Sequence, residues 1–73
     1  MKGREKFVPK VGAIYENHGG GEFRCLRSYG YNADMQNTKS GWTFLAHVCR
    51  RYESGKIDWE WSSGGRFLEV EKR

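Results

Sequence analysis

The chain has 73 residues, eleven of them aromatic (three Trp, four Tyr and four Phe), and a formal net charge of +4. Such a length has room for one domain, and because a domain of this size buries only about 60% of its unfolded surface, the aromatic residues must supply much of the core. No stretch approaches the roughly 18 apolar residues of a membrane-spanning helix, and the charged segment 1–6 is not followed by the apolar run of a secretory signal. We therefore expect a cytoplasmic protein with no membrane partner.

Positive charge is concentrated at the start of the chain. Residues 1–10 contain four Lys or Arg residues and one Glu, an excess of +3, which leaves +1 for the remaining 63 residues. We expect residues 1–6 to form a flexible basic tail and residues 7–73 to form a single small β domain.

Short strands separated by turn residues follow along the chain. Apolar and polar residues alternate in three segments, and the connections between them are rich in Gly and Asn. The predicted strands cover 11–16, 22–28 and 33–37.

A Trp-rich hairpin from Trp42 to Trp61 is the strongest signal. Residues 42–49 alternate in side-chain type, and the alternation resumes after the loop 53–56. The residues expected to face the core after that loop are Ile57, Trp59 and Trp61. The Gly64–Gly65 pair predicts a break before a last strand over 67–70. Together these segments predict a small antiparallel SH3-like barrel or a strongly twisted sheet of five to six short strands.

A helix over about 41–53 is the alternative for part of this hairpin, and it makes the fold α+β. Ser40 is a suitable N-cap, Gly55 follows the expected end, and an apolar stripe has helical spacing. The stripe consists of Trp42, Leu45, Ala46, Cys49 and Tyr52. We favour the strand because the segment is rich in β-branched and aromatic residues and is apolar on both sides.

The residues that carry reactive groups do not form a recognised pattern. His18, Cys25, His47 and Cys49 lack the spacing of zinc ligands, so we expect no metal and no cofactor. We expect the two cysteines to be reduced and buried, with one disulfide between them left open as an alternative.

Two closely spaced pairs were considered as catalytic groups. His47 and Cys49 are expected to share a strand face, and so are Asp58 and Glu60. The first pair has no third orienting group, and the second is interpreted as the solvated side of a strand. A chain this short also seldom encloses a cleft, so we expect no enzyme activity.

Tyrosine and arginine residues form the candidate binding surface. Aromatic rings beside cations suit single-stranded nucleic acid, and the same residue types dominate protein interfaces. The candidate binding residues are Arg24, Arg27, Tyr29, Tyr31, Arg50, Arg51 and Tyr52.

Three segments, 40–44, 55–61 and 64–67, resemble short uncharacterised proteins of bacterial phages and mobile elements. That resemblance implies an SH3-like barrel that acts by binding a host or defence protein stoichiometrically. We therefore expect a non-enzymatic protein-binding module, an inhibitor of such a protein, whose oligomeric state stays open. Single-stranded nucleic-acid or RNA binding is the alternative. Exposed tryptophans would mark a binding face, whereas buried ones would belong to the scaffold.

Overall fold

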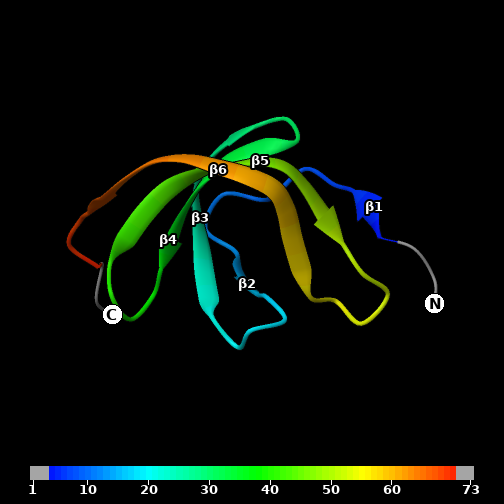
Figure 1. The fold of residues 1–73 in the computed structure, drawn as a ribbon, viewed down its shortest axis with the longest axis horizontal. Coiled ribbons are helices and arrows are strands. Elements are labelled where there is room, and N and C mark those ends of the chain that lie inside the picture. The colour runs from blue at the N-terminus through cyan, green and yellow to red at the C-terminus, as the bar shows by residue number, and fades with distance from the viewer. Residues whose placement is uncertain (1–3, 71–73) are drawn as a thin grey trace.

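The computed structural model describes residues 4–70, which contain six strands in one antiparallel sheet and no helix (Figure 1). The strands are β1 (Glu5–Lys6), β2 (Ile14–Glu16), β3 (Glu22–Tyr29), β4 (Asn32–Asn37), β5 (Trp42–Arg51) and β6 (Ile57–Phe67). The predicted fold class, a small antiparallel barrel or strongly twisted sheet, is confirmed. The helix considered over 41–53 is wrong, because this segment is β5. No described residue belongs to a helix of membrane-spanning length.

Strand β5 is the centre of the sheet. Its first half pairs with β4, its last two residues pair with β1, and β6 pairs with it on the other side from Trp42 to Arg51. Strands β3 and β2 extend the sheet beyond β4, and a single parallel bridge joins Asn17 to Ile57. The two longest strands, β5 and β6, form a curved ribbon that arches over the shorter strands (Figure 1).

A bend at Val48 carries β5 from β4 to β1. The last β5 residue in the β4 ladder is Ala46, and Val48 has a positive φ of 59°. The Val48 amide donates to Asn32 Oδ1 at 3.0 Å, and the Cys49 amide donates to the Tyr31 carbonyl at 2.8 Å. A β-branched residue rarely adopts a positive φ, so these two hydrogen bonds hold a conformation that the chain disfavours locally.

The core lies on one face of this curved sheet. Its members come from four strands, and each is at most 8% exposed. They are Phe23, Cys25, Ala33, Met35, Phe44, Ala46, Cys49 and Ile57. The half-buried Trp59 ring meets Phe23 and Phe44 with centroid distances of 5.4 and 5.1 Å. Cys25 and Cys49 are both unpaired and buried.

Two predictions for β6 are wrong. Trp61 is 55% exposed and does not join Ile57 and Trp59 in the core. The Gly64–Gly65 pair does not end the strand, because β6 continues to Phe67. It instead forms a bulge, since β6 has one residue more than β5 between the pairs Leu45–Ser63 and Thr43–Arg66. A Cβ on Gly65 would lie 2.3 Å from Trp42 Cζ2, so the glycine leaves space for that ring.

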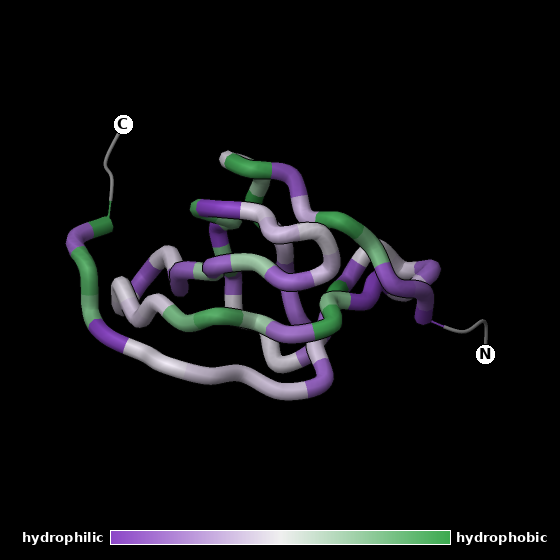
Figure 2. The backbone as a smooth tube through the Cα atoms, turned by 90° about the horizontal axis from the view of Figure 1, so that it is seen from above, coloured by the Kyte–Doolittle hydropathy of each residue, from purple (hydrophilic) through white to green (hydrophobic). Residues whose placement is uncertain are grey.

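Both ends of the described chain are attached to the sheet. Glu5 and Lys6 pair with Arg51 and Arg50, so paired structure begins two residues before the expected boundary at Phe7, while residues 1–3 lie outside the described range. After β6 the chain crosses β4, where Gln36 Nε2 donates to the Leu68 carbonyl at 3.1 Å. In Figure 2 hydrophobic and hydrophilic stretches alternate at the end of the described chain, and the hydrophobic Phe67 and Leu68 are exposed.

Candidate binding surface

The face of the sheet opposite the core carries a row of paired residues across four strands. Arg27 pairs with Asp34, Asp34 with Leu45, and Leu45 with Ser63. Paired residues in an antiparallel sheet point to the same side, and the neighbours of Asp34 and Leu45 in sequence point into the core. This row therefore forms the middle of an outward-facing surface from β3 to β6.

A groove with a volume of about 730 Å³ runs over this row. We call it the outer groove. It is lined by Leu26, Arg27, Tyr29, Asp34, Thr43, Phe44, Leu45, Ser63, Gly64, Gly65, Arg66 and Leu68. The size is within the range of sites that bind small ligands or side chains, and the lining combines leucines with two arginines.

Polar contacts fix one side of the outer groove. The Tyr29 hydroxyl donates to Asp34 Oδ2 at 2.8 Å. This hydrogen bond to the carboxylate raises the pKa of Tyr29, while Arg27 acts in the opposite direction. Arg27, Tyr29 and Asp34 therefore form one cluster on β3 and β4.

An aromatic stack lies next to the outer groove. The His47 and Trp61 rings are parallel within 4°, with centroids 3.6 Å apart. His47 Nε2 is 2.8 Å from the hydroxyl oxygen of Ser63, which lines the groove. The stack and this hydrogen bond hold an exposed tryptophan in one orientation.

A second aromatic pair stands at the other end of the β5–β6 ribbon. Trp42 and Phe67 are opposite each other, with ring centroids 4.8 Å apart in an edge-to-face arrangement. Trp42 is 39% and Phe67 68% exposed. Two of the three tryptophans are thus on the surface rather than in the scaffold.

The structure separates the seven candidate binding residues. Arg27 and Tyr29 line the outer groove. The other five, Arg24, Tyr31, Arg50, Arg51 and Tyr52, are not among its lining residues. The single patch expected from the sequence is therefore divided among several places.

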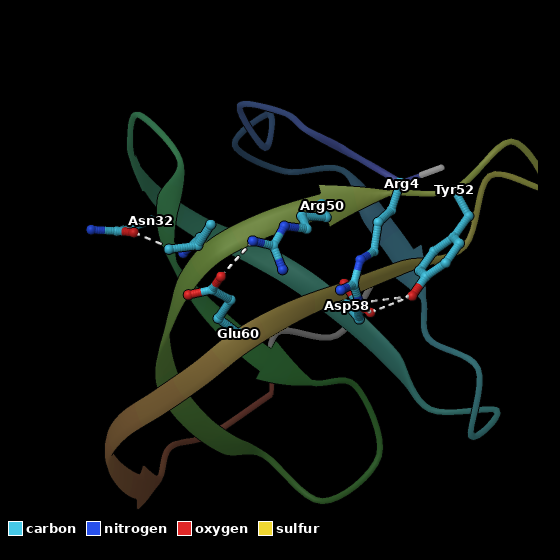
Figure 3. A network of polar contacts seen from close by, with 7 residues as sticks. Arg4, Asn32, Arg50, Tyr52, Asp58 and Glu60 are labelled. Atoms are coloured by element: carbon cyan, nitrogen blue, oxygen red, sulfur yellow. Dashed lines mark hydrogen bonds and ion pairs between the residues drawn. The ribbon is translucent and has the colours of Figure 1, made fainter. Parts of the chain in front are cut away.

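Three of these five residues are held by contacts with other side chains of the chain. Arg50 forms an ion pair with Glu60, and the Tyr52 hydroxyl donates to Asp58 Oδ2 at 2.6 Å (Figure 3). The Arg51 guanidinium lies 4.9 Å from the centroid of the Phe7 ring.

The remaining two make weaker contacts. Arg24 Nη1 donates to the Gly12 carbonyl at 3.4 Å, and Lys6 Nζ lies 5.6 Å from the centroid of the Tyr31 ring. Cation–π contacts at exposed sites contribute only about 0.5–1 kcal/mol, so Tyr31 stays an accessible surface residue.

Sequence reasoning missed Trp61, Arg66 and Leu68 as surface residues of interest. Strict alternation assigns Trp61 to the core, and the glycine pair assigns Arg66 to a turn and Leu68 to a separate strand over 67–70. The sequence signal for this exposed part of β6 is a Trp followed by Ser-Ser-Gly-Gly. Small residues bury little apolar surface, so a Trp beside them has few apolar partners.

The considered catalytic pairs do not converge. Cys49 is buried and His47 is stacked on Trp61, because the bend at Val48 turns the two residues in different directions. The carboxylates of Asp58 and Glu60 contact different arginines, Arg4 and Arg50. Within residues 4–70 no three His, Cys, Asp or Glu side chains are grouped closely enough to hold a metal ion.

No protein-family model, no curated protein and no solved structure matches this chain.

Proposed function

We propose that this chain is a non-enzymatic protein-binding module that uses the outer groove and the exposed aromatic residues around it. The observation that carries the proposal is the exposure of Trp61 and Tyr29, at 55% and 52%, on either side of a groove that contains two arginines. Trp, Tyr and Arg are the residue types that contribute most to protein interfaces. Fixing Trp61 against His47 lowers the entropy cost of ordering it in a complex.

The arrangement of the cations favours protein over nucleic acid. Arg4, Arg50 and Lys56 form ion pairs with acidic residues of the same chain, and Arg51 lies over Phe7. Binding of single strands depends on several cations that contact phosphates along a groove lined by aromatic rings. The outer groove has two arginines and also an aspartate, which supports a protein ligand.

Two further considerations support a stoichiometric binder. Each of Asp58 and Glu60 is engaged by a cation, and the Cys49 thiol is buried, so these groups are poorly placed for acid–base or nucleophilic chemistry. The resemblance of segments 40–44, 55–61 and 64–67 to phage and mobile-element proteins supports a host or defence protein as the target.

Affinity purification tests the proposal. The full chain is used as bait in nuclease-treated and untreated host lysates, beside a Trp61→Ser variant and a Val11→Ser control. Val11 is similarly exposed and is not among the residues that line the groove. We expect a partner protein in a fixed stoichiometric ratio that survives nuclease, is retained by Val11→Ser and is lost by Trp61→Ser. Recovery of nucleic acid without a protein partner would contradict the proposal.

A nucleic-acid titration provides the complementary test. Binding of an oligonucleotide is measured at low and moderate salt, because each phosphate contact contributes to the slope of log affinity against log salt. We expect no salt-dependent binding. A slope that corresponds to several phosphate contacts would support the nucleic-acid alternative.

A further inference from the structure

The outer groove has an apolar floor between two cationic edges. Leu45 lies in the middle of the floor, and Leu26 and Leu68 line it from β3 and from the segment after β6. Arg27 stands on β3 and Arg66 on β6. Because the four strands are spaced about 4.8 Å apart, β3 and β6 are separated by roughly 14 Å.

The dimensions fit an extended segment of polypeptide. At about 3.3 Å per residue, a segment of four to five residues spans roughly 14 Å. The groove is open at Gly64, where an added Cβ would have nothing within 4 Å, whereas the Trp42 ring occupies the space at Gly65. A ligand backbone can therefore approach β6 closely at the bulge.

The charges at the groove indicate the side chains that such a segment would carry. Within residues 4–70 neither Arg27 nor Arg66 is in an ion pair, whereas Arg4, Arg50 and Lys56 are. The one acid in the lining, Asp34, accepts the Tyr29 hydroxyl and is paired across the strands with Arg27. The groove thus offers, beside apolar surface, two guanidinium groups that are in no ion pair within residues 4–70. Guanidinium groups bind carboxylates in a bidentate manner.

We propose that the outer groove binds an extended segment of the partner protein in which acidic residues alternate with apolar ones. The apolar side chains pack on Leu45 between Leu26 and Leu68, and the carboxylates pair with Arg66 and Arg27. This inference rests on the proposed function and specifies the chemistry of the partner. A single-stranded nucleic acid fits less well, because two arginines and one aspartate leave a charge of only +1 in the lining.

The test uses defined peptides and the full chain. Fluorescein-labelled octapeptides with alternating Asp and Leu are compared with peptides in which Lys replaces Asp or Ser replaces Leu, and with an oligothymidylate of eight nucleotides. Fluorescence anisotropy measures affinity, and chemical-shift changes of backbone amides locate the site. We expect saturable binding of the Asp-Leu peptide, with the largest changes at Leu45 and residues 63–66, and at least fivefold weaker binding of the other three ligands.

Charge reversal at Arg66 provides the decisive comparison. We expect Arg66→Glu to lower the affinity for the Asp-Leu peptide about fivefold or more. The same variant should bind the Lys-Leu peptide more tightly than the unmodified chain does. Lys10→Glu makes the same change of charge at an exposed position outside the groove lining and should alter neither affinity. Unchanged urea midpoints for both variants establish that the fold is retained.

Several results would overturn this inference. They are equal affinity for the Asp and Lys peptides, tighter binding of the oligothymidylate, shifts centred on Trp42 and Phe67, or no saturable binding at about 1 mM peptide. Failure of the peptide test while a protein partner is still captured by the full chain would reject the inference alone. Loss of both would reject the proposed function as well.

Discussion

At the scale of single residues, the surroundings of Gly41 restrict which side chain fits there, and the surroundings of Cys49 set the pKa of its thiol. Gly41 is buried with a φ of +83°, and a Cβ built on it would lie 2.4 Å from the Leu68 carbonyl oxygen. That oxygen belongs to the backbone and cannot rotate away as a side chain does. Cys49 is surrounded by the core, and burial raises the pKa of its thiol to about 11, with a smaller effect from Cys25.

Gly41→Ala is expected to be strongly destabilising. The variant has both an unfavourable positive φ and a steric overlap, and each costs about 1–3 kcal/mol. Gly55→Ala is the matched control, because Gly55 has a φ of +93° with nothing within 4 Å of the added Cβ. Urea unfolding should show that Gly41→Ala lowers the free energy of unfolding by about 2 kcal/mol more than Gly55→Ala. Equal effects of the two substitutions would mean that the Leu68 segment does not cross Gly41.

The Cys49 thiol is expected to be unreactive and to make stability depend on alkaline pH. Its pKa is raised on folding, so the unfolded chain loses the thiol proton first as pH rises. The stabilisation is complete below about pH 9 and is lost toward pH 11, by up to roughly 2–3 kcal/mol. Urea midpoints at pH 8 and 10.5 should differ more for the unmodified chain than for Cys49→Ala. Rapid labelling of native protein by a thiol reagent at pH 7.4 would contradict the buried position.

At the scale of elements, alternation was sufficient to predict where β3, β4 and β5 begin, and insufficient to predict β1, the end of β6 or how the strands curve. β3, β4 and β5 begin within one residue of the predicted positions, since their apolar residues alternate regularly between turns. The predicted strand 11–16 is shortened to β2, because Val11 and Gly12 form a turn in which the Ala13 amide donates to the Lys10 carbonyl. The bend at Val48 depends on Tyr31 and Asn32, which lie far away in sequence, so no local pattern could reveal it.

The glycine pair shows a second limit of local reasoning. A Gly-Gly pair is typical of a turn and also of a β-bulge. The pairing of β6 with β5 on both sides of Gly64–Gly65 shows that this pair forms a bulge. For the same reason, only part of the candidate site could be predicted from the sequence. Arg27 and Tyr29 are predicted from the sequence, but Arg66 and Leu68 line the same groove because β6 continues through the bulge. Trp61 lies before the bulge and is held beside the groove by its stack on His47.

Asn32→Ala is expected to weaken the bend in β5. The substitution removes the acceptor of the Val48 amide and leaves that donor without its partner, which costs about 1–2 kcal/mol. Asn32→Asp keeps an oxygen at the same place and should retain at least half of this stability. Hydrogen exchange of the Val48 amide should accelerate in Asn32→Ala and stay slow in Asn32→Asp. Unchanged exchange in both variants would show that Asn32 does not hold the bend.

At the scale of the whole molecule, a small core leaves large apolar residues on the surface. The radius of gyration is 11.5 Å, and among residues 4–70 two aromatic residues, Phe23 and Phe44, are buried in the core. Other apolar side chains remain at least a third exposed. They are Val8, Val11, Ile14, Tyr29, Tyr31, Trp42, Trp61, Phe67 and Leu68. Exposed apolar surface near cationic groups is typical of a protein interface.

These exposed residues fall on different parts of the molecule, so the location of the interface can be measured. Tyr29, Trp61 and Leu68 lie at or beside the outer groove, whereas Val8, Val11 and Ile14 belong to the segment around β2. The proposed function assigns binding to the first group. The second group serves as an internal reference.

Hydrogen exchange on the complex with the captured partner tests this assignment most directly. The exchange rate of each backbone amide is compared between the free and the bound chain. We expect slower exchange in the bound chain over 26–29 and 61–68, and unchanged exchange over 8–14. Slower exchange confined to 8–14, or no change at any of these residues, would contradict the proposal that the outer groove is the binding site.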